Sequence, residues 1–94
     1  MNIGQSIKQL RKEQGISQIE FAKRVKISQT YLSLVESGKR GCGIHFLELI
    51  AKGLEIPLPV LFWFSIEVKD ILEDKKEHFE FLKPSIDQMI KSIL

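Results

Sequence analysis

The sequence predicts an all-helical protein, with an N-terminal domain over residues 1–64 and a helical extension over residues 65–94. Three observations support this fold class. Apolar residues return at intervals of three and four along most of the chain, as they do in amphipathic helices. Helix-capping residues stand directly before several of these segments, and no segment alternates as a strand would. With 94 residues, 44% of them hydrophobic, the chain is long enough for one modest core.

Two helices are expected near the N-terminus. The first covers residues 3–14, where apolar residues recur at helical spacing and Gly15 ends the pattern. The second begins after Ser17, which forms an S-x-x-E capping box with Glu20. In this motif each side chain binds the free backbone N–H of the other residue. The inward face of the second helix consists of Phe21, Ala22 and Val25.

Three more helices follow in the N-terminal domain. Ser28 caps the third helix, and Gly38 is expected to end it in a left-handed conformation. The fourth covers about residues 44–54, and a short fifth begins at Pro57, because proline suits a first helical turn. The core-facing residues of the third and fourth helices are Leu32, Val35, Leu47, Ile50, Ala51 and Leu54.

The C-terminal extension is apolar enough to be ordered. With one break at Pro84, its hydrophobic residues recur at helical spacing: Phe79, Leu82, Ile86, Met89, Ile90 and Ile93. Phe46 and Leu49 lie off the core-facing stripe of the fourth helix and offer an apolar surface for them to meet. Two interpretations follow. The extension either forms a homodimer interface, which we favour, or folds back to enlarge the core of its own chain.

The two parts of the chain carry opposite net charge. Residues 1–40 hold eight Lys and Arg against three Glu, whereas residues 41–94 hold six Lys against nine Asp and Glu. A basic front part suits a polyanion such as DNA. No apolar run approaches the roughly 20 residues that span a bilayer, and the N-terminus lacks the layout of a signal peptide. With Cys42 as the only cysteine, these features favour a cytoplasmic protein without a membrane partner.

No constellation of residues indicates an enzyme or a metal site. His45 and His78 lie far apart in sequence, and neither has a Cys or a carboxylate at metal-ligand spacing. The stretch GKRGCG lacks the G-x-x-x-x-G-K-S/T order of a phosphate-binding loop. Cys42 has no cation fixed beside it that would activate its thiol. The sequence therefore predicts no catalysis, no cofactor and no small-molecule ligand.

Two short helices joined by VKIS match a helix-turn-helix, whose second helix lies in the DNA major groove. The stretch SQIEFAKRVKISQTYLSLVESGKR, followed by IAKGLEIPLPVLF, resembles the Cro/lambda-repressor type of helix-turn-helix, the xenobiotic-response-element group of regulators. The resemblance covers about residues 3–63. It implies a five-helix lambda-repressor-like DNA-binding domain and leaves the extension unexplained.

The same resemblance implies a function. The chain is expected to be a sequence-specific DNA-binding transcriptional regulator that acts as a repressor, in the form of a homodimer on a double-stranded DNA operator. Its recognition helix, about residues 28–37, is expected in the major groove. The alternative is an antitoxin-like or adaptor protein whose C-terminal helices bind a different protein. Self-association of the extension favours the first interpretation, and a co-purifying partner favours the second.

Roles for individual residues also follow from the resemblance. The residues expected to contact bases are Gln29, Thr30, Ser33 and Leu34. Those expected to contact phosphates are Gln18, Tyr31, Lys39 and Arg40. For Leu34 and Tyr31, packing within the protein is an equal alternative. Arg11 and Glu36 are expected to form an internal ion pair that holds the first helix to the end of the recognition helix.

Two residues depart from the pattern of the family. Lys26 and Glu55 stand at helix ends where the family usually has glycine. Both are expected to adopt left-handed backbone geometry, at a steric cost of roughly 1 kcal/mol each. The segment GCGIH also replaces the usual polar-Pro approach to the fourth helix, which leaves the path of that loop open.

Overall fold

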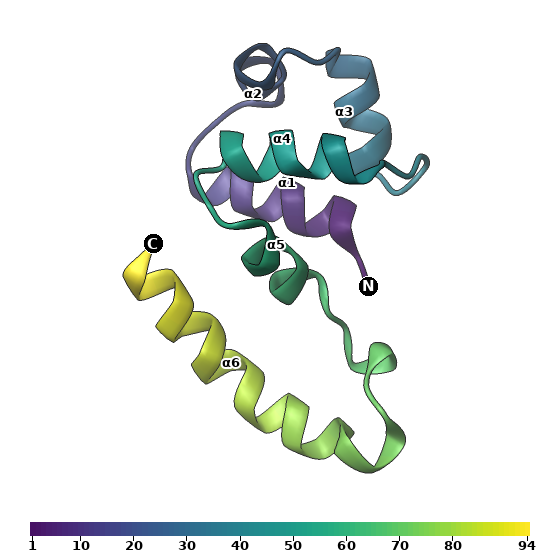
Figure 1. Cartoon of the computed structure of the whole chain (residues 1–94), viewed down its shortest axis with the longest axis vertical. Helices are drawn as coiled ribbons and strands as arrows, with labels where there is room; N and C mark the ends of the chain where they lie inside the picture. Colours follow the sequence, from purple (N-terminus) through teal and green to yellow (C-terminus); the bar gives the residue numbers. More distant parts are fainter.

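Six α-helices and two short 3-10 turns follow one another without a strand (Figure 1). A computed structural model describes all of residues 1–94. The elements are α1 (Ile3–Glu13), α2 (Gln18–Val25), α3 (Gln29–Glu36), α4 (Ile44–Gly53), α5 (Leu58–Ser65), η1 (Val68–Asp70), η2 (Glu73–Lys75) and α6 (Lys76–Ile93). The predicted all-α class is confirmed. α5 begins at Leu58, one residue later than predicted, and Pro57 is its N-cap.

The first five helices enclose one hydrophobic core. Its fourteen buried hydrophobic residues all come from α1 to α5 and the loops between them. The largest fully buried hydrophobic side chains are Phe21, Ile7, Leu32, Ile50, Leu54 and Leu61. α1 packs against α3 and α5, while α2 packs against α3 and α4. Burial of each large side chain is worth about 1.5–3 kcal/mol, so this packing holds α2 and α3 in a fixed relation.

The crossing of α1 and α3 depends on Gly4. A Cβ atom at this position would overlap the carbonyl oxygen of Val35. Only a residue without a side chain therefore lets the two helices approach this closely. The close approach places the C-terminal end of α3 directly against α1.

The ends of α2 and α4 pass through left-handed residues other than glycine, as predicted. Lys26 has a φ of 61° and Glu55 a φ of 60°. In each case the next residue reaches back into the helix: Ile27 N–H donates to the Ala22 carbonyl at 3.0 Å, and Ile56 N–H donates to that of Ala51 at 3.0 Å. These bonds satisfy helix-end carbonyls and offset the steric cost of the left-handed residue.

α6 is one continuous helix through Pro84, where a break was predicted. A proline inside a helix lacks the N–H that would bond to the carbonyl four residues earlier, and its ring crowds that turn. Pro84 is exposed at the helix surface. The helix nevertheless continues past it to Ile93. The predicted break is therefore wrong.

α6 lies beside α5 at the edge of the five-helix domain (Figure 1), and none of its residues is buried. Polar and aromatic contacts attach it. The Trp63 indole N–H donates to Asp87 Oδ1 at 2.6 Å, and the rings of Trp63 and Phe79 lie 6.1 Å apart. Lys91 Nζ donates to Glu13 Oε1 at 3.1 Å. The Trp63–Asp87 bond is partly buried, whereas the Lys91–Glu13 bond is exposed to water.

The hydrophobic residues predicted for dimerisation divide into two sets on α6. Phe79, Ile86 and Ile90 are half-buried by their own chain. Leu82, Met89 and Ile93 remain 49%, 67% and 82% exposed. One side of the helix therefore folds back onto its own chain, as in the alternative to a dimer interface, and the other side stays free.

Candidate nucleic-acid interface

α2 and α3 form a helix-turn-helix in which serine caps both helices. The Ser17 hydroxyl oxygen accepts from the Glu20 backbone N–H at 3.1 Å, and that of Ser28 accepts from the Tyr31 N–H at 3.0 Å. In the predicted capping box, the Glu20 carboxylate accepts from the Ser17 hydroxyl at 3.1 Å instead of from the backbone N–H of Ser17. Each cap satisfies a free N–H in the first turn, which fixes where α3 begins.

α3 has one buried and one exposed face. Leu32 and Val35 lie in the core, with 0% and 3% of their surface exposed. Gln29, Thr30 and Ser33 are exposed. The buried face anchors the helix, and the opposite face presents amide and hydroxyl groups of the kind that read base edges in a major groove.

The turn after α3 carries two exposed cations, Lys39 and Arg40. Its tightest point is Gly38, with a φ of 77°, in the predicted left-handed conformation. The carbonyl oxygen of Leu34 accepts from the backbone N–H groups of Lys39 and Arg40 at 3.0 and 3.2 Å. Leu34 itself is half-buried, whereas the side chains of Lys39 and Arg40 are exposed. Both cations thus emerge within one turn of the end of α3.

Tyr31 is packed between an aromatic ring and a guanidinium group. Its ring meets that of Phe46 edge-on, with centroids 4.6 Å apart, and the Arg40 guanidinium lies 4.8 Å above it. A cation–π contact of this kind is worth about 0.5–1 kcal/mol at an exposed site. Phe46, which was expected to meet the extension, instead supports Tyr31. The sequence did not indicate this role, because the contact depends on how α3 and α4 cross.

A chain of hydrogen bonds links α1 to the start of α3. Arg11 donates from Nε to Glu36 Oε2 at 2.8 Å and from Nη2 to Oε1 at 2.9 Å. Gln18 Nε2 donates to the same Oε1 at 3.1 Å, and Gln29 Nε2 donates to Gln18 Oε1 at 3.4 Å. The structure thus brings together the residues of the expected ion pair, one expected phosphate contact and one expected base contact.

The Arg11–Glu36 pair is almost fully removed from water. The side chains are 6% and 2% exposed, and Arg11 Nη1 donates in addition to the carbonyl of Ile16 at 2.8 Å. An intact buried pair adds little net stability, but removal of one partner leaves a buried charge without compensation. The pair therefore fixes the positions of α1, α2 and α3 relative to one another.

The remaining candidate residues lie outside this network. Burial raises the pKa of the Cys42 thiol, which lowers its thiolate fraction at neutral pH. His45 Nδ1 lies 4.0 Å from Glu48, and the His45 side chain is 96% exposed. No three or more His, Cys, Asp or Glu residues come close enough together to hold a metal ion. None of the helices combines the length and the hydropathy needed to cross a membrane.

Comparison with known proteins gives a family match and several relatives. A family model described as helix-turn-helix matches residues 7–61. The control protein C.MunI of Mycoplasma sp is 41% identical over 63 residues, which are 66% of this chain and 85% of that protein. The immunity repressor protein of Bacillus phage phi105 is 31% identical over 61 residues, but this chain spans only 42% of its length.

A solved structure is similar over the same part of the chain. The wild-type restriction-modification controller protein C.Esp1396I is 38% identical, with a TM-score of 0.61, over 65% of this chain and 79% of that one. The matched family segment contains the whole α2–α3 unit and its network, and it ends before α6.

Proposed function

The chain belongs to the helix-turn-helix family and is a DNA-binding transcription regulator, and we propose that it acts as a homodimeric, sequence-specific repressor. Each copy places α3 in the major groove of one half-site. Gln29, Thr30 and Ser33 contact bases there, and the half-buried Leu34 contacts bases with the part of its side chain that remains exposed. The phosphate contacts come from Gln18, Lys39 and Arg40, while Tyr31 orients Arg40 through its ring.

One observation carries this proposal, namely the hydrogen-bond chain that ends on Gln29. Its link from Gln18 holds the amide of Gln29 at the exposed start of α3. A side chain held in advance loses less conformational freedom on binding, so more of its interaction energy appears as affinity. A Gln amide can bond bidentately to adenine N6 and N7.

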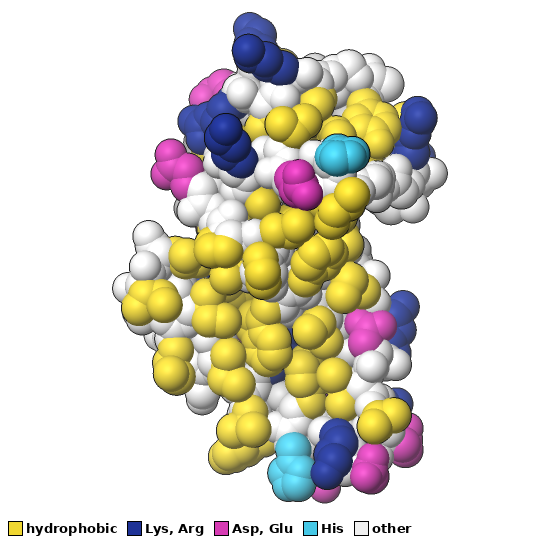
Figure 2. Space-filling view, in the orientation of Figure 1, with side chains coloured by type: hydrophobic (Ala, Val, Ile, Leu, Met, Phe, Trp, Pro, Cys, Tyr) yellow, Lys and Arg dark blue, Asp and Glu magenta, His cyan; other side chains and the backbone are white.

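Dimerisation follows from how little one recognition helix can read. Helix-turn-helix dimers bind two half-sites about 34–36 Å apart, and operator symmetry mirrors the symmetry of the protein. The two copies therefore need a self-complementary surface. Figure 2 shows hydrophobic side chains gathered in one continuous face over α4, α5 and α6. The most exposed large hydrophobic side chains on these helices are Ile44, Leu49, Phe81, Leu82, Met89 and Ile93.

The extent of this apolar face supports the proposal that a second copy of the chain packs against it. An exposed apolar surface that continues across three helices is typical of an interaction site. Burial of a Leu, Ile or Met side chain is worth about 1.5–3 kcal/mol, so a few such contacts from each copy support a dimer. α5 is apolar around its whole circumference except for Ser65, and α6 covers its Trp63 flank.

The biological setting that the relatives favour is control of restriction–modification genes. Two relatives of which this chain covers 79% or more are named as control or controller proteins. The phage repressor is covered over less than half of its length. The alternative of a different protein partner on α6 keeps the same DNA-binding domain and changes only the occupant of the apolar face.

The test is a selection of bound sites from random DNA, followed by sedimentation of the complex. We expect an enriched palindrome with half-sites one helical turn apart, two chains per duplex, and affinity that falls steeply with salt. Each phosphate neutralised adds about −0.9 to the slope of log K against log salt. Absence of an enriched sequence, or binding that is indifferent to salt, would contradict the proposal. A complex with one chain per duplex would contradict the proposed homodimer.

A further inference from the structure

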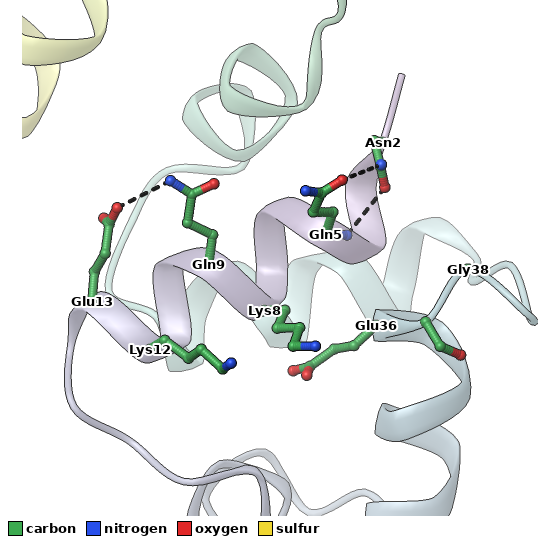
Figure 3. Close-up of a pocket in the computed structure, with 9 residues that line it drawn as sticks. Asn2, Gln5, Lys8, Gln9, Lys12, Glu13, Glu36 and Gly38 are labelled. Carbon is green, nitrogen blue, oxygen red and sulfur yellow. Dashed lines mark hydrogen bonds between the residues drawn. The ribbon is translucent and has the colours of Figure 1, made fainter.

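A polar groove of about 740 Å³ runs along the exposed side of α1 beside the C-terminal end of α3 (Figure 3). No hydrophobic side chain lines it. Figure 3 shows the side chains of Lys8 and Lys12 pointing from α1 to the side on which Glu36 lies. The groove is therefore bounded by α1 on one side and by the end of the recognition helix on the other.

Two lysines and two acids line the groove, but both acids are paired with cations that lie outside it. Glu36 is paired with Arg11 at 2.8 Å, and Glu13 accepts from a lysine of α6 at 3.1 Å. Neither Lys8 nor Lys12 takes part in any of the chain's ion pairs, which extend to 4.0 Å. Lys8 and Lys12 stand four residues apart, about 6 Å along the axis of α1, and so form a row of two unpaired cations. Such a row suits a linear polyanion.

The groove also adjoins the proposed DNA interface on two sides. Glu36, in its wall, accepts from Gln18 at 3.1 Å, and Gln18 is one of the proposed phosphate contacts. Gly38, which also lines the groove, is followed directly by Lys39 and Arg40. A DNA strand that touches these residues therefore passes close to the mouth of the groove.

We propose that Lys8 and Lys12 bind DNA phosphates beyond the base pairs that α3 reads, so that α1 forms the outer part of the interface. The inference rests on the proposed function and assigns it two further residues. Contacts of this kind fix the position and orientation of the protein on the duplex without reading sequence. The sequence had indicated these lysines only as part of the charge of residues 1–40, because their place beside Glu36 depends on the crossing of α1 and α3.

Four binding measurements test it. The wild-type protein and the variant Lys8→Gln/Lys12→Gln are titrated with two duplexes that carry the selected operator. One duplex extends about one helical turn beyond the operator on each side, and the other ends at its outermost selected base pair. On the long duplex we expect the variant to bind about tenfold more weakly at 0.1 M salt, with a salt slope smaller by about 1–2. Trimming the duplex should weaken binding of the wild type by a similar factor and binding of the variant little. The variant already lacks the lysines that contact the removed phosphates, so the two losses are not additive.

The matched control is Lys52→Gln/Lys75→Gln, which removes the same charge from exposed lysines of α4 and η2. We expect it to bind both duplexes as the wild type does, within about twofold, and circular dichroism confirms that each variant is folded. The inference is overturned if the control loses as much affinity as the variant, or if trimming weakens the variant as much as the wild type. A wild-type protein without salt-dependent binding to the long duplex would instead remove the proposed function itself.

Discussion

The five-helix domain and α6 each contain a short carboxylate–cation pair, and the two pairs differ in their surroundings. Arg11 and Glu36 are 2.8 Å apart with side chains 6% and 2% exposed. Lys83 and Asp87 are 3.0 Å apart with side chains 20% and 28% exposed. The five-helix domain that holds the first pair contains fourteen buried hydrophobic residues, whereas α6 has no buried residue.

The difference separates a fixed part of the molecule from an adaptable one. Core burial and a desolvated network determine where α3 lies, so its exposed residues have a defined geometry before DNA arrives. α6 is held by contacts that water can partly replace, and it keeps an apolar side free. A DNA-binding regulator benefits from the fixed part, because side chains held in place before binding lose less conformational freedom when they contact DNA.

Removal of one carboxylate from each pair should give the largest contrast. Glu36→Ala leaves the Arg11 guanidinium buried and uncompensated, so the free energy of unfolding should fall by about 3–5 kcal/mol. Asp87→Ala removes a partly exposed acceptor of Lys83 and Trp63, so the loss should be about 1–2 kcal/mol. Urea unfolding followed by circular dichroism measures both. Equal losses would mean that the two pairs are equally accessible to water.

The free side of α6 is tested by Leu82→Glu/Met89→Glu. If these side chains lie in the dimer interface, each substitution should raise the dimer dissociation constant by about tenfold or more. The reason is that burial of each side chain in the interface is worth about 1.5 kcal/mol or more. The unfolding free energy of the monomer should change by less than about 0.5 kcal/mol, because both side chains are exposed there. Sedimentation equilibrium measures the dissociation constant.

Gln88→Glu/Ser92→Glu is the control for this variant, because it adds the same charge to exposed polar positions of α6. We expect the control to dimerise as the wild type does. A wild-type chain that is monomeric at micromolar concentration, or a Leu82→Glu/Met89→Glu variant that still dimerises normally, would exclude this side of α6 as the interface.

The fixed part of the molecule should also be sensitive to a single methyl group. Gly4→Ala places a Cβ against the Val35 carbonyl, and the resulting separation of α1 and α3 should lower the unfolding free energy by about 1–3 kcal/mol. Gly41→Ala is its control, since a Cβ there meets nothing within 4 Å. Thermal unfolding compares the two variants. Similar unfolding midpoints for the two variants would show that α1 and α3 can accommodate a Cβ atom where they cross.

The smallest expected effect concerns strain inside the fixed part. Lys26→Gly should raise the unfolding free energy by less than about 1 kcal/mol, because relief of the left-handed conformation is partly offset by greater entropy of the unfolded chain. The same substitution at Glu55 gives an independent measurement at a matched φ. Clear destabilisation by both would mean that the side chains contribute more than the left-handed backbone costs.

Much of the five-helix domain was predictable because its determinants are local. Capping serines, helical spacing and the positions of Lys26, Glu55 and Gly38 act within one or two turns of the chain. The candidate DNA-contacting residues followed from a resemblance whose motif is contiguous. Pro84 was misread because a proline signals a helix end only on average, and whether the helix continues depends on the bonds of the turns around it.

The sequence by itself determined which segments of residues 1–64 are helical, which face of α3 carries polar groups, and that residues 1–40 are basic. These properties depend on the order of residues and on short-range geometry. The tertiary structure alone decided that Phe46 supports Tyr31, that α6 divides its hydrophobic residues between its own chain and solvent, and that Lys8 and Lys12 lie beside Glu36. Each of these depends on the angle and distance at which helices far apart in sequence cross, and residue spacing does not specify either quantity.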